Sequence, residues 1–84
     1  MDNNVDEMAI RLGQLIGEWL KETRELKGLS QRALAKKSGV DKTTIDRYEK
    51  GFSNMNIPIL IRIVQAMDCQ ISFDLSERLP EPEG

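Results

Sequence analysis

Apolar residues recur every three or four positions along the first third of the chain, which is the period of one face of a helix. The positions that follow this period are Val5, Met8, Leu12, Leu15, Ile16, Trp19, Leu20 and Leu26. Asn4 and Glu7 have the spacing of an N-terminal capping box, and Gly28 suits the left-handed residue that ends a helix. The pattern predicts a helix over residues 5–27 whose apolar side chains, including that of Trp19, lie in the core.

Three shorter helices are predicted after Gly28, because cap residues and glycines alternate at regular intervals. The N-cap candidates are Ser30, Asp41 and Asn56, and the glycines that end the first two of these helices are Gly39 and Gly51. The connections are only a few residues long, so the helices must cross steeply and share one core. The expected core positions are Leu29, Leu34, Ala35, Val40, Ile45, Tyr48, Leu60 and Val64.

A change of period marks the C-terminal part of the chain. The fourth helix, with the sequence NIPILIRIVQAMD, is apolar on nearly every side, and Ile71, Phe73 and Leu75 then alternate with polar residues as in a half-buried strand. No second strand is predicted, so the strand at 70–75 is expected to pair with that of a second copy and form a homodimer. Residues 76–84 are rich in proline and acidic residues and are expected to form a flexible tail.

The stretch from Gln31 to Lys50 has the features of two helices joined by a tight turn. Ala35 is small where the two helices would approach most closely, and Gly39 can adopt the positive φ that the turn requires. The inward residues of the second helix are Val40, Ile45 and Tyr48, and its outward polar residues are Lys42, Thr43, Asp46, Arg47 and Lys50. The outward face therefore offers hydrogen-bond donors and acceptors to a molecule outside the domain.

The charge is unevenly distributed along the chain. The net charge is −2, but residues 27–51 contain seven basic and three acidic residues, which gives +4 there and −6 elsewhere. A basic middle section is typical of nucleic-acid binding, although a solvated helix face can have the same composition.

Composition excludes several classes of protein. The 84 residues include one cysteine and no histidine, so we expect no enzyme, no metal site and no cofactor. Cys69 is expected to be a small buried residue, with a disulfide across the dimer axis as the alternative. The sequence has no apolar run of about 18 residues and begins with acidic residues, so we expect a cytoplasmic protein that does not bind membranes.

The stretch LSQRALAKKSGVDKTTIDRYEKG, preceded by IGEWLKETRELKG, resembles the helix-turn-helix domain of the phage repressor and Cro (Xre) family. The resemblance covers roughly residues 16–67, and it implies a compact, all-α domain of four to five helices over residues 1–67, with the helix-turn-helix at 31–50. In that family the second helix of the pair enters the major groove, and dimers contact two half-sites about 34 Å apart.

The resemblance also implies roles for individual residues. It places Lys42, Thr43 and Arg47 at base edges and Gln31 at a phosphate, and it pairs Arg24 with Glu49, although two independently solvated charges are the alternative for that pair. Further candidates for phosphate contacts, from their own chemistry, are Lys36, Lys50, Ser53 and Asn54. The loop GFSNMN lacks the basic residues that relatives often have, and Asp46 either repels phosphate or accepts a hydrogen bond from cytosine.

The resulting hypothesis is a sequence-specific transcriptional regulator, an autorepressor that binds a palindromic operator as a homodimer through Ile71, Phe73 and Leu75. A repressor-like domain followed by such a strand also resembles the antitoxins of toxin-antitoxin operons, which would add a toxin as a partner. Stand-alone regulators and restriction-modification controllers would have almost the same sequence features. The alternative function is a protein-interaction module with the same fold that does not bind DNA.

Overall fold

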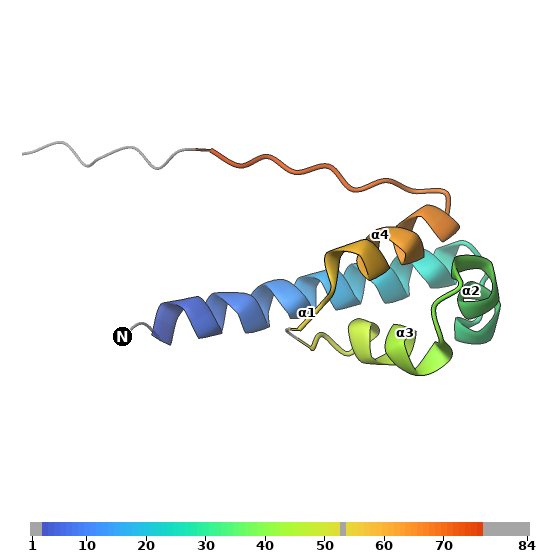
Figure 1. The fold of residues 1–84 in the computed structure, drawn as a ribbon, viewed down its shortest axis with the longest axis horizontal. Helices are drawn as coiled ribbons and strands as arrows, with labels where there is room; N and C mark the ends of the chain where they lie inside the picture. The colour runs from blue at the N-terminus through green and yellow to red at the C-terminus, as the bar shows by residue number, and fades with distance from the viewer. Residues whose placement is uncertain (1–2, 53, 77–84) are drawn as a thin grey trace, which may run out of the picture.

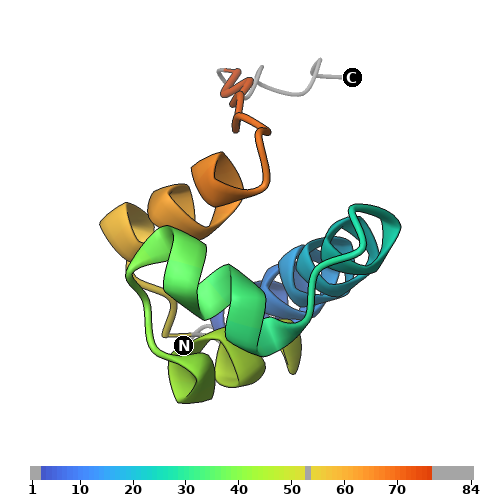
Figure 2. The ribbon, with the colours of Figure 1, turned by 90° about the vertical axis from the view of Figure 1, so that its right-hand side faces the viewer.

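A computed structural model describes residues 3–52 and 54–76, and these residues contain four helices. The helices are α1 (Asn3–Leu26), α2 (Gln31–Ser38), α3 (Lys42–Glu49) and α4 (Ile57–Ala66). Helix α1 has 24 residues, and the three short helices gather around its C-terminal half (Figure 1). Helix α3 packs against both α1 and α2, while α4 packs against α2 (Figure 2). The prediction of an all-α domain with four helices is confirmed for the described residues.

The core lies where the four helices meet. Its most deeply buried side chains are Leu20, Leu34, Ile45, Ile63, Val64 and Met67. Six of the expected core positions are buried, namely Leu34, Val40, Ile45, Tyr48, Leu60 and Val64. Leu29 and Ala35 are partly buried and pack against this cluster. One hydrophobic core therefore holds all four helices together.

The predicted cap residues of the three short helices are confirmed. The side chains of Ser30, Asp41 and Asn56 accept hydrogen bonds from backbone N–H groups three residues later, at 3.0, 2.7 and 3.0 Å. These bonds satisfy donors that the first turn of a helix leaves without a partner. The hydrogen bond from Thr44 also lowers the pKa of the Asp41 carboxyl, which keeps it ionised at the positive end of α3.

Two expectations about α1 are wrong. The helix begins at Asn3, so Asn4 lies inside it rather than at its cap, and it ends at Leu26. Trp19, expected in the core, is 42% exposed. The same holds for other residues of the apolar stripe: Val5, Met8, Leu12, Leu15 and Leu26 are all exposed. The reason is that α2, α3 and α4 cover only one side of the C-terminal half of α1, where Ile16 and Leu20 pack.

The strand expected at 70–75 is not formed within the described chain. Residues 70–76 are extended, but they have no strand pairing with any other described segment. They leave α4 and run back above α1 toward its N-terminal half (Figure 1). Phe73 and Leu75 are 71% and 92% exposed, while Ile71 is partly buried. A strand requires a neighbour for its backbone hydrogen bonds, and the described residues of one copy do not supply it. The expected tail lies outside the described residues from position 77 onward.

Candidate nucleic-acid interface

The turn between α2 and α3 fixes the position of the candidate interface. Gly39 has a φ of 75°, in the left-handed region that favours glycine, and its N–H donates to the carbonyl of Ala35 at 2.9 Å. Val40 follows and is buried in the core. Ala35 and Gly39 thus end α2 and redirect the chain into α3 within three residues.

Helix α3 has one buried face and one exposed face. Ile45 and Tyr48 are buried, and the Tyr48 hydroxyl accepts a hydrogen bond from the backbone N–H of Asn56 at 2.7 Å. Lys42, Thr43 and Arg47 are exposed, and their spacing places them within an arc of about 140° around the helix. The buried face of α3 packs against the core, and its opposite face presents three polar side chains on one accessible surface.

A buried ion pair attaches the C-terminal end of α3 to α1. Arg24 donates to both carboxylate oxygens of Glu49, from Nε at 2.6 Å and from Nη2 at 3.1 Å, and its Nη1 donates to the carbonyl of Leu29 at 2.8 Å. The side chains of Arg24 and Glu49 are 10% and 4% exposed. The hydrogen bond to Glu49 raises the pKa of Arg24. Two parallel bonds fix orientation as well as distance, so this pair sets the angle of α3.

Gln31, expected at a phosphate, is hydrogen-bonded within the domain. Its Nε2 donates to Glu49 Oε1 at 3.0 Å and to Asp46 Oδ1 at 3.2 Å. Gln31 therefore joins the first turn of α2 to the last two turns of α3. A phosphate contact through the same nitrogen would replace these bonds.

Asp46 and Lys50 form a local ion pair on the exposed face of α3. Lys50 Nζ lies 2.9 Å from Asp46 Oδ2. The hydrogen bond from Lys50, followed by that from Gln31, lowers the pKa of Asp46. The carboxylate is therefore ionised and compensated within the protein, which reduces its repulsion of a nearby phosphate.

Phe52 contacts a candidate base-reading residue and was not anticipated from the sequence. The guanidinium of Arg47 lies over its ring, 5.4 Å from the centroid. A cation over an aromatic face is attracted by the ring quadrupole, so the ring orients Arg47. Phe52 is 49% exposed and lies in the loop that follows α3, whose sequence GFSNMN contains no charged residue. An aromatic residue five positions after an outward arginine was the available signal.

The remaining candidate phosphate ligands lie on separate elements. Lys36 is exposed on α2, and Asn54 is exposed in the connection to α4. Ser53 lies outside the described residues. The neighbouring Lys37 forms an ion pair instead, with its Nζ 3.9 Å from Asp68 Oδ2.

Two glycines of α1 allow the close contact that supports α3. A Cβ atom at Gly17 would lie 2.6 Å from the carbonyl oxygens of both Tyr48 and Glu49, and one at Gly13 would lie 2.9 Å from the carbonyl oxygen of Gly51. No flexible side chain separates these backbones. Only glycine therefore fits at position 17 without a shift of α1 relative to α3.

The comparisons with known proteins agree with this geometry. A family model described as helix-turn-helix matches residues 20–73, which is more than half of the chain. The chain is also similar to a protein of Pyrococcus furiosus that is named as a proposed HTH-type transcriptional regulatory protein, with 40% identity over 52 residues. The match covers 62% of this chain and 16% of that protein, so the chain spans less than a fifth of the length of this relative.

Proposed function

Because this chain belongs to the Xre-type helix-turn-helix family, we propose that it is a sequence-specific transcriptional regulator that binds a palindromic operator as a homodimer and represses its own promoter. The single observation that carries this proposal is the exposed polar face of α3. Helix α3 is short and is attached to α1 through Glu49 and Gly17, and its exposed face contains cationic and hydroxyl side chains of the kinds that form hydrogen bonds with base edges.

The base contacts are assigned to three residues of α3. Arg47 can donate two hydrogen bonds to O6 and N7 of guanine, and the ring of Phe52 restricts the rotamers from which it does so. Lys42 can reach the same acceptors. Thr43 can donate to a base or contact a thymine methyl group. These roles agree with the exposure of all three side chains.

The phosphate contacts are assigned to residues that flank this face. Lys36 precedes α3 in the sequence and Asn54 follows it, and both side chains are exposed. Ser53 is the neighbour of Asn54 in the sequence. Lys50 would contact a phosphate while its ammonium remains close to Asp46. Gln31 would act chiefly by positioning α3. Few basic groups are available in each copy, so operator affinity depends on two linked copies.

The homodimer is proposed to use the extended segment at 70–75. Ile71, Phe73 and Leu75 alternate with polar residues, and the backbone of this segment is not paired with another described segment. Pairing with the same segment of a second copy would satisfy those backbone groups and bury Phe73. Such a dimer presents two α3 helices to half-sites about 34 Å apart.

A role as the antitoxin of a toxin-antitoxin operon is the more specific form of this proposal. The combination of the helical domain with an apolar extended segment supports it, and the partner would be the protein encoded beside this chain. Co-expression tests it: rescue of growth from a toxic neighbouring gene product, together with co-purification of the two proteins, is the expected result. We assign no catalytic role.

The experiment that tests DNA reading is selection of operators from a random pool, followed by titration on selected and scrambled duplexes at two salt concentrations. We expect a palindromic preference and a steep decrease in affinity with salt. Arg47→Ala should reduce the preference, whereas Arg62→Ala, which removes an exposed arginine from α4, serves as the matched control. Equal affinity for the selected and scrambled duplexes would contradict sequence reading and favour a protein-interaction module.

A further inference from the structure

Helix α1 has an apolar face that no described part of the chain covers. This α1 apolar face consists of Val5, Met8, Leu12, Leu15 and Trp19, which are 65%, 69%, 58%, 58% and 42% exposed. The intervals between them are three, four, three and four residues, the a and d positions of a heptad repeat. Such a spacing is the pattern by which one helix packs along another.

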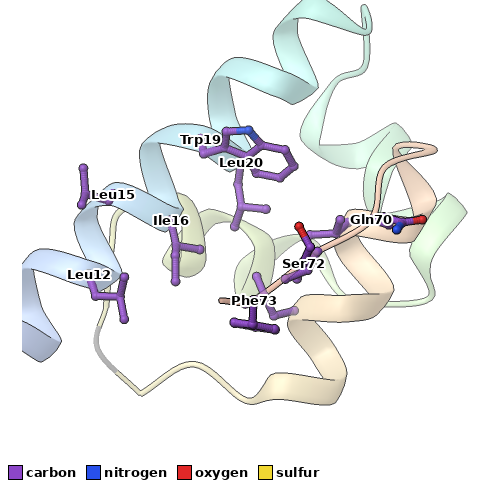
Figure 3. A pocket seen from close by; sticks show the side chains of 11 residues that line it. Leu12, Leu15, Ile16, Trp19, Leu20, Gln70, Ser72 and Phe73 are labelled. Carbon is purple, nitrogen blue, oxygen red and sulfur yellow. The ribbon is translucent and has the colours of Figure 1, made fainter. Parts of the chain in front are cut away.

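The α1 apolar face borders an open groove beneath the extended C-terminal segment. Figure 3 shows Leu12, Leu15 and Trp19 on one side of this groove and Phe73 on the other. Leu60 and Val64 of α4 also line it, and its volume is about 510 Å³. An apolar groove beside a helix with a heptad pattern fits a second amphipathic helix.

We propose that α1 of a second copy of this chain occupies the groove, antiparallel to the first α1, about a two-fold axis near residues 13 and 14. In this register Leu12 faces the partner's Leu15, and Met8 faces the partner's Trp19. Each contact occurs twice because the axis relates the two copies. The thioether of Met8 lies against an aromatic ring, which is a favourable contact.

Charge complementarity selects this orientation. Arg11 and Glu18 occupy equivalent heptad positions beside the apolar residues, and both are exposed. In the antiparallel pair, Arg11 and the partner's Glu18 both lie between the Met8 layer and the Leu12 layer of the interface. They can therefore form an ion pair, and the two-fold axis repeats it. In a parallel pair, Arg11 would instead face the partner's Ile16. Within one chain Arg11 and Glu18 are about 10 Å apart along the helix axis, and neither forms an ion pair with another described residue.

The available area agrees with a dimer of moderate stability. The five residues of the α1 apolar face from each copy would bury about 600–1,200 Å² in total, scaled from the area of a typical buried apolar side chain. A standard interface buries about 1,200–2,000 Å². Phe73 and Ile71 extend the same surface across the groove, which brings the total into that range. Residues 77–84 contain a single apolar side chain other than proline, Leu79, and do not match the face.

The inference rests on the proposed homodimer and adds a contact through α1 to the proposed pairing of residues 70–75, so sedimentation of the free protein tests it without DNA. Leu12→Glu and Leu15→Glu place charges in the central layers and should weaken dimerisation by about 100-fold or more. Circular dichroism should show unchanged helix content, because both side chains are exposed in one copy.

Charge reversal tests the register. Arg11→Glu and Glu18→Arg should each weaken self-association roughly 5- to 30-fold, because each turns two attractive pairs into repulsive ones. An equimolar mixture of the two variants should form heterodimers, and the double variant should recover self-association. Lys21→Glu reverses an exposed charge on the side of α1 opposite the apolar face and serves as the matched control.

Each other outcome overturns a defined part of the proposal. A parent chain that is monomeric at every concentration contradicts the homodimer as well as the α1 contact. Operator binding is tested separately, by the selection and titration described above. A parent dimer that persists in both leucine variants contradicts the α1 contact alone. Charge variants that associate with themselves as tightly as with each other contradict the antiparallel register. A monomeric parent that sediments with phosphatidylglycerol vesicles would assign the α1 apolar face to a lipid surface instead.

Discussion

The buried carboxylate of Glu49 is the most informative single position for testing how α3 is held. Glu49→Gln keeps the size and shape of the side chain but removes its charge. Arg24 then retains a full positive charge at a side chain that is only 10% exposed, with the amide and the Leu29 carbonyl as its remaining partners. The variant isolates the electrostatic part of the contact.

The magnitude follows from the burial of the pair. Removal of one partner from a buried ion pair costs about 3–5 kcal/mol, and the lower value applies here because Arg24 keeps hydrogen-bond acceptors and some contact with water. A domain of 84 residues has a total stability of about 4–13 kcal/mol. A loss of about 3 kcal/mol should lower Tm by about 12–24 °C for a chain of this size.

Thermal and urea unfolding followed by circular dichroism are the appropriate assays. Glu7→Gln, the same change at an exposed position of α1, should leave Tm unchanged and provides the control. The double variant Arg24→Met with Glu49→Leu should recover most of the lost stability, because apolar residues of similar volume often replace a buried ion pair without cost. It should still bind operator DNA less tightly than the parent, since Gln31 loses its acceptor on Glu49 and the angle of α3 is less restricted.

One result would refute this reasoning. A Tm difference of less than about 2 °C between Glu49→Gln and the parent corresponds to a loss of stability below about 1 kcal/mol. In that case the pair behaves as a solvated ion pair and does not fix α3. The same conclusion would follow if the double variant bound DNA as tightly as the parent.

Three further predictions concern other parts of the molecule. Arg47→Ala should cost about 1–3 kcal/mol of operator binding and relax specificity at one base pair, measured by titration on single-substitution duplexes; a uniform loss on all duplexes would indicate a phosphate contact instead. Gly17→Ala should destabilise the domain and weaken DNA binding together, because the added methyl group meets two carbonyl oxygens of α3, whereas alanine at the exposed Gln14 should be tolerated. The lowered pKa of Asp41 predicts that its cap stabilises α3 above the unfolded-state pKa of about 3.9 and is lost as pH falls through the lower folded-state value. The difference in stability between Asp41→Asn and the parent should therefore decrease below about pH 4, and a constant difference would contradict the assignment.

Local signals in the sequence predicted the short helices well. The caps at Ser30, Asp41 and Asn56 depend on hydrogen bonds within three residues, so their spacing is visible without knowledge of the tertiary structure. The burial of α1 was not predictable in the same way. Whether Trp19 lies in the core depends on which side of α1 the other helices cover, and a helical period records only that one side is apolar.

The candidate site was predictable in outline but not in its side-chain contacts. The exposed face with Lys42, Thr43 and Arg47 follows from the helical period. The bonds of Gln31 to α3 and the position of Phe52 beneath Arg47 depend on the crossing of two helices and on the path of a loop. These are relations between residues that the sequence alone does not bring together.

The contact of Gly17 with the end of α3 has a consequence for how such a domain can change over time. The backbones of α1 and α3 are in direct contact at Gly17, so the orientation of α3 depends on that of α1. An insertion of one residue into α1 beyond this contact would rotate the two parts of the helix by about 100° relative to each other. Residues added to the connection between α3 and α4 after Phe52 would leave the angle of α3 unchanged, because Gly51 and Phe52 would keep their contacts with α1 and Arg47. Descendants of this chain should therefore tolerate length variation in that connection and resist it in α1.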